Sequence, residues 1–201
     1  MTTRKLVLVR HGHAQQAAGT CIGWTDLPLS RWGSDRVTAL LADWHGVPEE
    51  LHTSDLLRAG GSAAIFAHGW GLVPRADHRL REMHFGSWEG RAWDAIEADR
   101  GARFPGHKPD WIHERNPEGE SFADVLIRVA GWKAEVLDPG VTERVVVVGH
   151  AGSLRALLCL LTGTPAERAF EFTVELARAT VLESTGAGWV ITADQVNQVR
   201  L

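Results

Sequence analysis

The sequence comprises 201 residues, of which 44% are hydrophobic and 23% are charged. This composition is typical of a globular protein and argues against a disordered chain, a collagen-like fibre or a coiled coil. The 25 acidic and 21 basic residues give a net charge of −4, which does not indicate binding to nucleic acid. The length predicts a single domain, residues 1–201.

Cys21 and Cys159 are too few for a disulfide framework, and Cys159 lies in an apolar run typical of a protein core. The longest apolar runs are too short to span a membrane, and the apolar segment at residues 6–9 is too short for a signal peptide. We therefore expect a cytoplasmic protein that does not associate with membranes.

The expected elements begin with an apolar run at Leu6–Val9, which is typical of a central strand buried on both faces. A loop rich in glycine, threonine and proline follows over residues 12–29. Ser30 is the expected N-cap of the next helix, because its hydroxyl can accept a hydrogen bond from the first turn. The apolar face of that helix comprises Val37, Leu40, Leu41 and Trp44.

A short strand is expected over residues 50–53, followed by a helix that ends near Ala67. Ser54 or Asp55 is the expected N-cap of this helix, since both side chains can accept a hydrogen bond from a free backbone N–H.

A further helix is expected to begin after Ser121, with Asp124 three residues later forming an approximate capping box. Its apolar side chains recur at close to helical spacing. They are Phe122, Val125, Leu126, Val129, Trp132 and Val136. A second central strand is expected at Val145–Val148, followed by a helix whose apolar face is formed by leucines 154, 157, 158 and 161. Residues 180–183 and 189–192 are expected to form a hairpin.

Strands that alternate with helices predict an α/β fold, here a three-layer α/β/α sandwich with a mostly parallel central sheet. The stretch from Gly86 to Glu120 is rich in tryptophan, proline and charge and does not follow this alternation. We expect residues 86–120 to be an insertion over the edge of the sheet where the parallel strands end.

Three polar clusters each follow an expected strand: Arg10-His11-Gly12, residues 54–58 and Gly149-His150-Ala151-Gly152. The loops after parallel strands converge on one crevice, so two histidines and two arginines are expected to meet there. Free N–H groups at helix N-termini favour an anion, and guanidinium groups match the oxygens of phosphate or carboxylate. The pattern therefore indicates an anion site with two imidazoles, which favours phosphate chemistry.

These clusters and their order resemble the histidine phosphatase superfamily, the phosphoglycerate-mutase-like proteins, over about residues 5–165. The resemblance is carried by Arg10-His11-Gly12, Gly23–Leu29, Thr53–Ala59, Leu80–Gly90, Gly119-Glu120-Ser121 and Val148–Gly152. Any single tripeptide would be weak support, but the ordered set with strands before the first and last motifs is specific.

The resemblance implies that His11 is the nucleophile that becomes phosphohistidine and that Arg10, Arg58 and His150 form the phosphate pocket. It implies that Glu82 gives a proton to the leaving group and then acts as base for water. An imidazole nitrogen can attack phosphorus without first losing a proton, fixed cations stabilise the transferring phosphoryl group, and an alkoxide leaving group needs an acid.

Some positions depart from the family pattern. The family commonly has an Asn that contacts phosphate a few residues after Arg-His-Gly, and here Gln16 is the candidate to replace it. Ala151 stands where the family often has a second glycine, but its backbone N–H is still available to phosphate. Gly23 is a further phosphate-binding candidate from the loop motif.

Within the superfamily, the segments around Glu82 and Ser121 are similar to the phosphatase branch and in particular to α-ribazole phosphatases. The implied reaction is removal of the 5′-phosphate from α-ribazole 5′-phosphate, a cobalamin lower-ligand precursor. The mutases usually have longer chains with extra segments over the site. The expected partners are a small-molecule phosphate ester and inorganic phosphate as product, with no cofactor, and a homodimer is left open.

Three alternatives stand beside this hypothesis: a phosphoglycerate-type mutase, a phosphate-ligand binder without catalysis, and a metal-dependent hydrolase. We expect no metal, because no metal-ligand spacing such as His-Glu-x-x-His occurs and two arginines beside the histidines would repel a cation. Four tryptophans are candidates either for pocket walls or for simple packing. They are Trp24, Trp88, Trp93 and Trp111.

Overall fold

The main element of the computed structural model, which describes residues 3–100, 110–185 and 188–201, is a six-stranded sheet in the order β4-β3-β5-β1-β6-β7. The strands are β1 (Lys5–Arg10), β3 (Glu50–Thr53), β4 (Arg75–Ala76), β5 (Arg144–Gly149), β6 (Ala179–Thr185) and β7 (Gly188–Val196). The first four strands in this order run parallel, and β6 and β7 are antiparallel to their neighbours. The mostly parallel sheet and the C-terminal hairpin are therefore confirmed.

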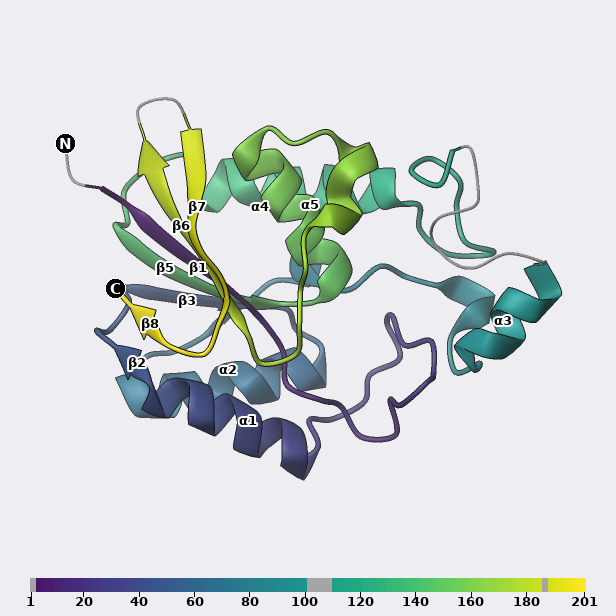
Figure 1. Ribbon diagram of the computed structural model, residues 1–201, viewed down its shortest axis with the longest axis horizontal. Coiled ribbons are helices and arrows are strands. Elements are labelled where there is room, and N and C mark those ends of the chain that lie inside the picture. Colours follow the sequence, from purple (N-terminus) through teal and green to yellow (C-terminus); the bar gives the residue numbers. More distant parts are fainter. Residues whose placement is uncertain (1–2, 101–109, 186–187) are drawn as a thin grey trace.

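Two pairs of helices cover the two faces of the sheet (Figure 1). Helices α1 (Arg31–Ala42) and α2 (Leu57–Trp70) lie on one face, and α4 (Phe122–Val136) and α5 (Ala151–Thr162) lie on the other. The valines at positions 7, 9, 146 and 148 pack toward α1 and α2, whereas Leu6, Leu8, Val145 and Val147 pack toward α4 and α5. Both faces of the central strands are buried, which explains their continuous apolar runs and confirms the three-layer architecture.

Two predicted helix starts are confirmed by their hydrogen bonds. The Ser30 hydroxyl accepts from the backbone N–H of Gly33 at 3.0 Å. At α4 the Ser121 hydroxyl accepts from the N–H of Asp124 at 3.2 Å, while the Asp124 carboxylate accepts from the N–H of Ser121 at 2.8 Å. The capping box is thus complete, with the carboxylate of Asp124 in the role usually filled by Glu or Gln.

The predicted N-cap of α2 is wrong. The helix follows Leu56, and the backbone N–H of Leu57 donates to the carboxylate of Asp26 at 2.6 Å. Asp55 instead holds the guanidinium of Arg81 with two hydrogen bonds of 2.7 and 2.6 Å. A side chain from a loop 31 positions away therefore satisfies the free N–H group that a local cap would have satisfied.

A second, two-stranded sheet joins β2 (Trp44–His45) to β8 (Val199–Arg200). Trp44 was expected on the apolar face of the first helix, but α1 ends at Ala42 and Trp44 lies in β2. Its ring is still buried, with centroids 5.5 Å from Phe66 and 5.0 Å from Trp70. The hydrophobic side chain keeps its place in the core although the backbone has left the helix.

The region expected to be an insertion contains the short 3₁₀ helix η2 (Gly86–Trp88) and α3 (Trp93–Arg100), while residues 101–109 lie outside the described part. Helix α3 stands beyond the sheet edge where the parallel strands end (Figure 1). Two further 3₁₀ helices are η1 (His78–Leu80) and η3 (Ala166–Glu171). The N–H of Cys21 donates to the Arg91 carbonyl at 2.8 Å, which joins the insertion to the loop after β1.

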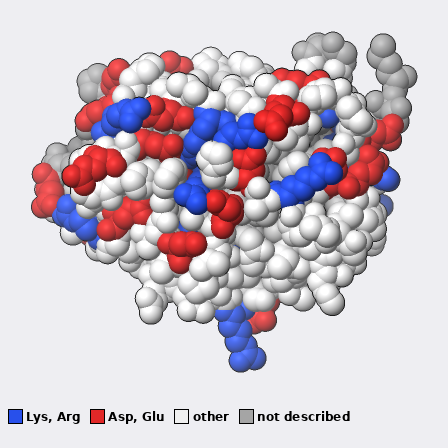
Figure 2. Space-filling view, turned by 180° about the vertical axis from the view of Figure 1, so that it is seen from behind, with Lys and Arg blue, Asp and Glu red and all other residues white. Residues whose placement is uncertain are grey.

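None of the described helices is long and apolar enough to cross a membrane. On the face shown in Figure 2, basic and acidic side chains are intermixed rather than separated by sign. That face therefore presents no continuous basic stripe of the kind that binds a nucleic-acid backbone.

Candidate active site

The register of the sheet brings the ends of three parallel strands level with one another. Arg10 of β1 pairs with Gly149 of β5, and Thr53 of β3 pairs with Val148. Because β5 lies between β3 and β1, the residues that follow the strands meet at one edge. The rings of His11 and His150 lie side by side there, with centroids 4.8 Å apart and planes inclined by 58°.

His11 is held in one tautomer. Its Nδ1 lies 2.6 Å from the Gly12 carbonyl oxygen. A carbonyl oxygen only accepts hydrogen bonds, so Nδ1 carries the proton and Nε2 keeps its lone pair. The pKa of His11 lies well below its usual range, because burial disfavours the imidazolium and the guanidiniums of Arg58 and Arg10 repel it. His11 is therefore a buried, neutral imidazole with a free lone pair on Nε2.

Gly12 is required by the close approach of α1. A Cβ at this position would lie 2.5 Å from the carbonyl oxygen of Gly33. Its N–H donates to the Ser62 hydroxyl at 3.0 Å, and that hydroxyl donates to the Arg58 carbonyl at 2.8 Å. The loop after β1 is thus fixed to the helix that carries Arg58.

His150 is fully buried at the N-cap of α5. Its pKa also lies well below the usual range, because of burial first and then repulsion by His11, Arg58 and Arg10. Across the described residues, six buried side-chain nitrogens lack a hydrogen-bond partner, and four of them belong to His150, Arg10 and Arg58. Buried polar groups are almost always satisfied, so this cluster of unpaired nitrogens marks a place for a ligand with several acceptor oxygens.

Backbone carbonyls hold the two predicted arginines. Arg58 is 1% exposed and donates from Nη2 to the Gly23 carbonyl at 2.6 Å and from Nη1 to the Thr25 carbonyl at 3.0 Å. Arg10 donates from Nη1 to the Val174 carbonyl at 2.8 Å. Carbonyl groups orient a guanidinium without cancelling its charge, so both side chains keep a full positive charge beside His11.

Arg155 is a third arginine at the site and was not expected there from the sequence. It lines the same cavity, its Nε donates to the Phe172 carbonyl at 3.1 Å, and its guanidinium carbon lies 4.9 Å from the Phe170 ring centroid. Within the parts of the chain that the structure describes, Arg10, Arg58 and Arg155 make no ion pair with a carboxylate. Arg155 lies three residues after Gly152 on α5, and positions three apart share a helix face, but this spacing alone does not distinguish it from other helical arginines.

Glu82 lies 9% exposed at the rim of this cluster. Its Oε1 accepts from the backbone N–H of Met83 at 2.9 Å and from that of Gly152 at 2.8 Å. A Cβ at position 152 would lie 2.3 Å from Oε1, so only glycine admits the carboxylate. Glu82 therefore joins the N-terminus of α5 two residues after His150.

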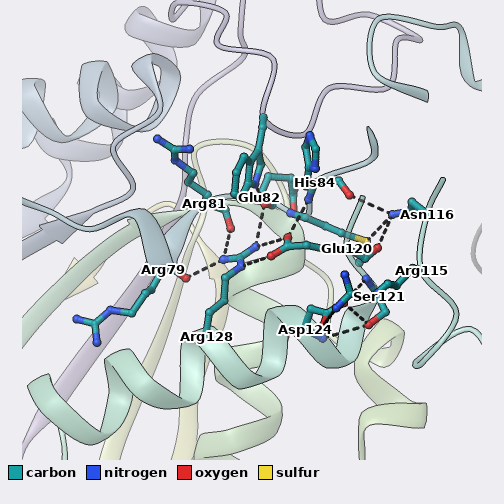
Figure 3. A network of polar contacts seen from close by, with 12 residues as sticks. Arg79, Arg81, Glu82, His84, Arg115, Asn116, Glu120, Ser121, Asp124 and Arg128 are labelled. Carbon is teal, nitrogen blue, oxygen red and sulfur yellow. Dashed lines mark hydrogen bonds and ion pairs between the residues drawn. The ribbon is translucent and has the colours of Figure 1, made fainter. Parts of the chain in front are cut away.

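A partly buried network of hydrogen bonds and an ion pair holds the segment that carries Glu82 (Figure 3). Arg128 of α4 donates to the backbone carbonyl of Glu82 at 2.9 Å and pairs with the carboxylate of Glu120. The Trp24 indole N–H donates to the same Glu82 carbonyl at 2.8 Å, while its ring packs on His84 with centroids 4.7 Å apart. None of these positioning contacts was predicted, because they join segments distant in the sequence.

The three remaining residues predicted to bind phosphate, Gln16, Gly23 and Ala151, lie differently with respect to the cavity. Ala151, the first residue of α5, lines the cavity. Gln16 is exposed with φ of 55° and is not among the residues that line it. Gly23 does not line it either, and its carbonyl instead accepts from Arg58. Glu89 was missed, although its carboxylate accepts from the N–H groups of Trp24 and Phe85 at 2.7 and 3.2 Å and so fixes this loop.

The cavity in front of His11 has a volume of about 550 Å³. Of the four candidate tryptophans only Trp93 lines it, and the other three have packing or hydrogen-bonding positions elsewhere. The apolar part of the lining includes Ile22, Phe85, Trp93, Phe122, Phe170 and Leu176. The site therefore combines a cationic end around His11 with a largely aromatic wall.

The two cysteines are poor alternatives to His11 as a nucleophile. Both cysteines are buried, and burial together with Glu89 raises the pKa of Cys21 to about 12. Such a thiol is not ionised at neutral pH, which leaves it a poor nucleophile. No group of three or more His, Cys, Asp or Glu side chains suited to a metal ion occurs among the described residues.

Comparison with known proteins identifies the family. A model of the histidine phosphatase superfamily (branch 1) matches residues 6–196. A glucosyl-3-phosphoglycerate phosphatase of Mycobacterium tuberculosis is 35% identical over 179 residues, covering 82% of this chain and 78% of that protein. A 2,3-bisphosphoglycerate-dependent phosphoglycerate mutase of Arthrobacter is 31% identical over 195 residues, covering 80% and 78%. The crystal structure of a putative α-ribazole-5′-phosphate phosphatase from Escherichia coli superposes with a TM-score of 0.88 at 26% identity and covers 98% of both chains.

The chain therefore belongs to the histidine phosphatase superfamily, which confirms the resemblance seen in its motifs. Its similarity to phosphatases identifies it as an enzyme of phosphate-ester chemistry.

Proposed function

We propose that the chain is a metal-independent phosphomonoesterase that hydrolyses a small-molecule phosphate ester through phosphohistidine on His11. The observation that carries this proposal is the group of unpaired buried nitrogens of Arg10, Arg58 and His150 around an imidazole whose Nε2 lone pair is free. A phosphoryl group supplies the acceptor oxygens that these donors lack. Three guanidiniums without carboxylate partners also make the site unfavourable for a metal cation.

In the first step the Nε2 lone pair of His11 attacks phosphorus, and the bond between phosphorus and the ester oxygen breaks. Arg10, Arg58 and one N–H of His150 donate to the phosphoryl oxygens, whose negative charge is spread in the transition state. Glu82 transfers its proton to the departing oxygen and becomes a carboxylate. Because Oε1 already accepts two N–H bonds, the proton is carried on Oε2.

In the second step the Glu82 carboxylate takes a proton from water, and the oxygen of that water attacks phosphorus. The bond between phosphorus and Nε2 breaks, its electron pair returns to His11, and inorganic phosphate leaves. Glu82 is then protonated again, so the cycle needs no other reactant.

The experiment that tests this proposal is phosphate release from 4-nitrophenyl phosphate in excess chelator. We expect full activity for the wild-type enzyme and its loss in His11→Ala. Activity that disappears on chelation would support the metal-dependent hydrolase. Tight phosphate binding without turnover would support a binder, and phosphoryl transfer between phosphoglycerates without net release would support the mutase.

The first candidate substrate is α-ribazole 5′-phosphate, and with it a step in cobalamin biosynthesis. This choice is supported by the motif resemblance and by the similarity to the putative α-ribazole-5′-phosphate phosphatase over 98% of both chains. The aromatic wall of the cavity, including Phe85, Trp93 and Phe122, suits an aromatic base attached to the ribose.

A second candidate class is a phosphate ester whose leaving group carries a carboxylate. The observation that favours it is Arg155, which lines the cavity, forms no ion pair within the described residues and adds a third positive charge beside the two that the phosphoryl group needs. A planar guanidinium binds a carboxylate with two parallel hydrogen bonds. Hydrolysis of α-ribazole 5′-phosphate and of carboxylated sugar phosphates by the same preparation separates the two candidates.

A further inference from the structure

We infer that Arg128, together with Glu120, is a positioning residue that sets the orientation of the Glu82 carboxyl group. The inference rests on the acid role of Glu82 in the proposed function. Arg128 lies on α4 and is not among the residues that line the cavity. Its charge adds a small repulsion to those that lower the pKa of His150, but its hydrogen bonds go to the segment that carries Glu82 and to Glu120. Figure 3 shows its guanidinium surrounded by main-chain oxygens of this segment.

All five N–H donors of Arg128 are used. Nη1 donates to the carbonyls of Arg79 and Arg81 at 2.7 and 2.8 Å. Nη2 donates to the Glu82 carbonyl at 2.9 Å and to Glu120 Oε2 at 3.1 Å. Nε donates to Glu120 Oε1 at 2.9 Å. A guanidinium has five N–H groups in a fixed plane, so this arrangement fixes three carbonyls of one segment relative to α4.

Glu120 fixes the main chain on the C-terminal side of Glu82 as well. Its Oε2 accepts from the backbone N–H of His84 at 2.9 Å. Glu120 directly precedes the N-cap Ser121, so the capping box of α4 fixes the start of the helix next to it. Main-chain groups both before and after Glu82 are therefore attached to one ion pair.

The ion pair is largely shielded from water, with 13% of the Arg128 side chain and 16% of the Glu120 side chain exposed. Charge-assisted hydrogen bonds in such surroundings are short and directional. The carboxyl group of Glu82 is fixed at its other end by Gly152 of α5. Arg128 thus determines where the backbone of Glu82 lies, and Gly152 determines where its carboxyl group points.

If Arg128 acts through the proton donor Glu82, its loss should slow the hydrolysis of an ester more when the leaving group needs protonation. 4-Nitrophenolate departs with little protonation, whereas an alkoxide requires it. We expect Arg128→Met to lower kcat/KM for an alkyl phosphate by about 10²-fold, the lower end of what general acid catalysis contributes. Activity toward 4-nitrophenyl phosphate and inhibition by inorganic phosphate should change little, because the donors around His11 are intact.

Arg128→Lys should recover only part of the loss, since an ammonium has three donors and no planar fork. Lys133→Met is the control: Lys133 lies on the same helix and binds Asp138 at 2.7 Å, and within the described residues it makes no hydrogen bond or ion pair with the segment that carries Glu82. It should leave the ratio of the two activities unchanged. Glu120→Gln, which removes the charge but keeps the shape, provides a second variant if Arg128→Met does not fold.

The decisive experiment combines Arg128→Met with Glu82→Gln. If Arg128 acts through Glu82, it has almost no further effect on alkyl phosphate hydrolysis once Glu82 is replaced, because coupled residues are not additive. Independent losses in the double variant, or equal losses for both esters in Arg128→Met, would overturn the inference. Equal losses for both esters in Glu82→Gln alone would instead remove the acid role from the proposed function, and the inference with it.

Discussion

His11 and His150 face each other at the ends of two neighbouring parallel strands, with ring centroids 4.8 Å apart and both side chains buried. A proton on either ring would bring a positive charge next to Arg10, Arg58 and the other ring. Burial and this repulsion lower the pKa of both histidines. Two imidazoles can therefore share the site with two guanidiniums only as neutral rings, and the neutral ring is the form that attacks phosphorus.

The first prediction concerns the protonation of His11. A lowered pKa means that the ring stays neutral as the pH falls through the ordinary histidine value of about 6.5. Nitrogen-15 NMR of the ligand-free enzyme should show Nδ1–H as the single tautomer of His11 and no titration of that ring between about pH 7.5 and 6. Titration of the His11 ring near 6.5 would contradict the assignment.

The second prediction concerns Gly152. Gly152→Ala introduces a Cβ 2.3 Å from Glu82 Oε1, so the carboxyl group must move. We expect a loss of about 10²-fold in alkyl phosphate hydrolysis and a smaller loss with 4-nitrophenyl phosphate. Gly131→Ala is the control, because nothing lies within 4 Å of a Cβ added there and alanine favours an exposed helix. Equal alkyl phosphate hydrolysis by the two variants would mean that Glu82 does not act as the proton donor from its position beside Gly152.

The pair of histidines and Arg10 could be predicted from the sequence, because they stand at the ends of two strands recognisable by their apolar runs. Arg58 follows the short strand at residues 50–53, which has no such run, and its place was predicted from the ordered set of motifs. Parallel strands end at one edge, so the four side chains had to meet there. Arg155 could not be ranked above any other helical arginine, since its function depends on the cavity that it lines, which is formed by segments distant in the sequence. That cavity belongs to the tertiary structure.

The N-cap of α2 also could not be predicted, because it depends on a contact between residues distant in the sequence. Ser54 and Asp55 have suitable side chains at a suitable place, but the helix N–H of Leu57 is satisfied by Asp26 from another loop. Local capping rules assume that a nearby side chain is free, and Asp55 is engaged by Arg81 instead. The capping box at Ser121 was predictable because both of its partners lie within one turn.

The third prediction concerns the hydrogen bond between Asp26 and the N-terminus of α2. Asp26→Ala removes the acceptor for the Leu57 N–H and should lower the free energy of unfolding by about 1 kcal/mol, a typical cost for loss of a helix cap. Asp26→Asn keeps an acceptor oxygen and should lose less. Urea denaturation of both variants measures the difference. No change in Asp26→Ala would show that water satisfies the helix end equally well.

The fourth prediction separates the two candidate substrate classes. If Arg155 binds a carboxylate, Arg155→Leu should raise KM for a carboxylated phosphate ester by about 10-fold or more, as expected for loss of a charge-assisted hydrogen bond. Its effect on the matching carboxamide, which has the same shape and no charge, should be small. Equal increases for the ester and its amide would show that Arg155 serves the phosphoryl group or the fold instead.

The proposed mechanism requires a covalent bond between phosphorus and His11 Nε2. Rapid quenching of wild-type enzyme in alkali after mixing with a phosphorus-32-labelled ester, followed by peptide mapping, tests it directly. We expect an alkali-stable, acid-labile label on the peptide that contains His11, and no label in His11→Ala. A label on another residue, or full turnover by His11→Ala, would contradict it.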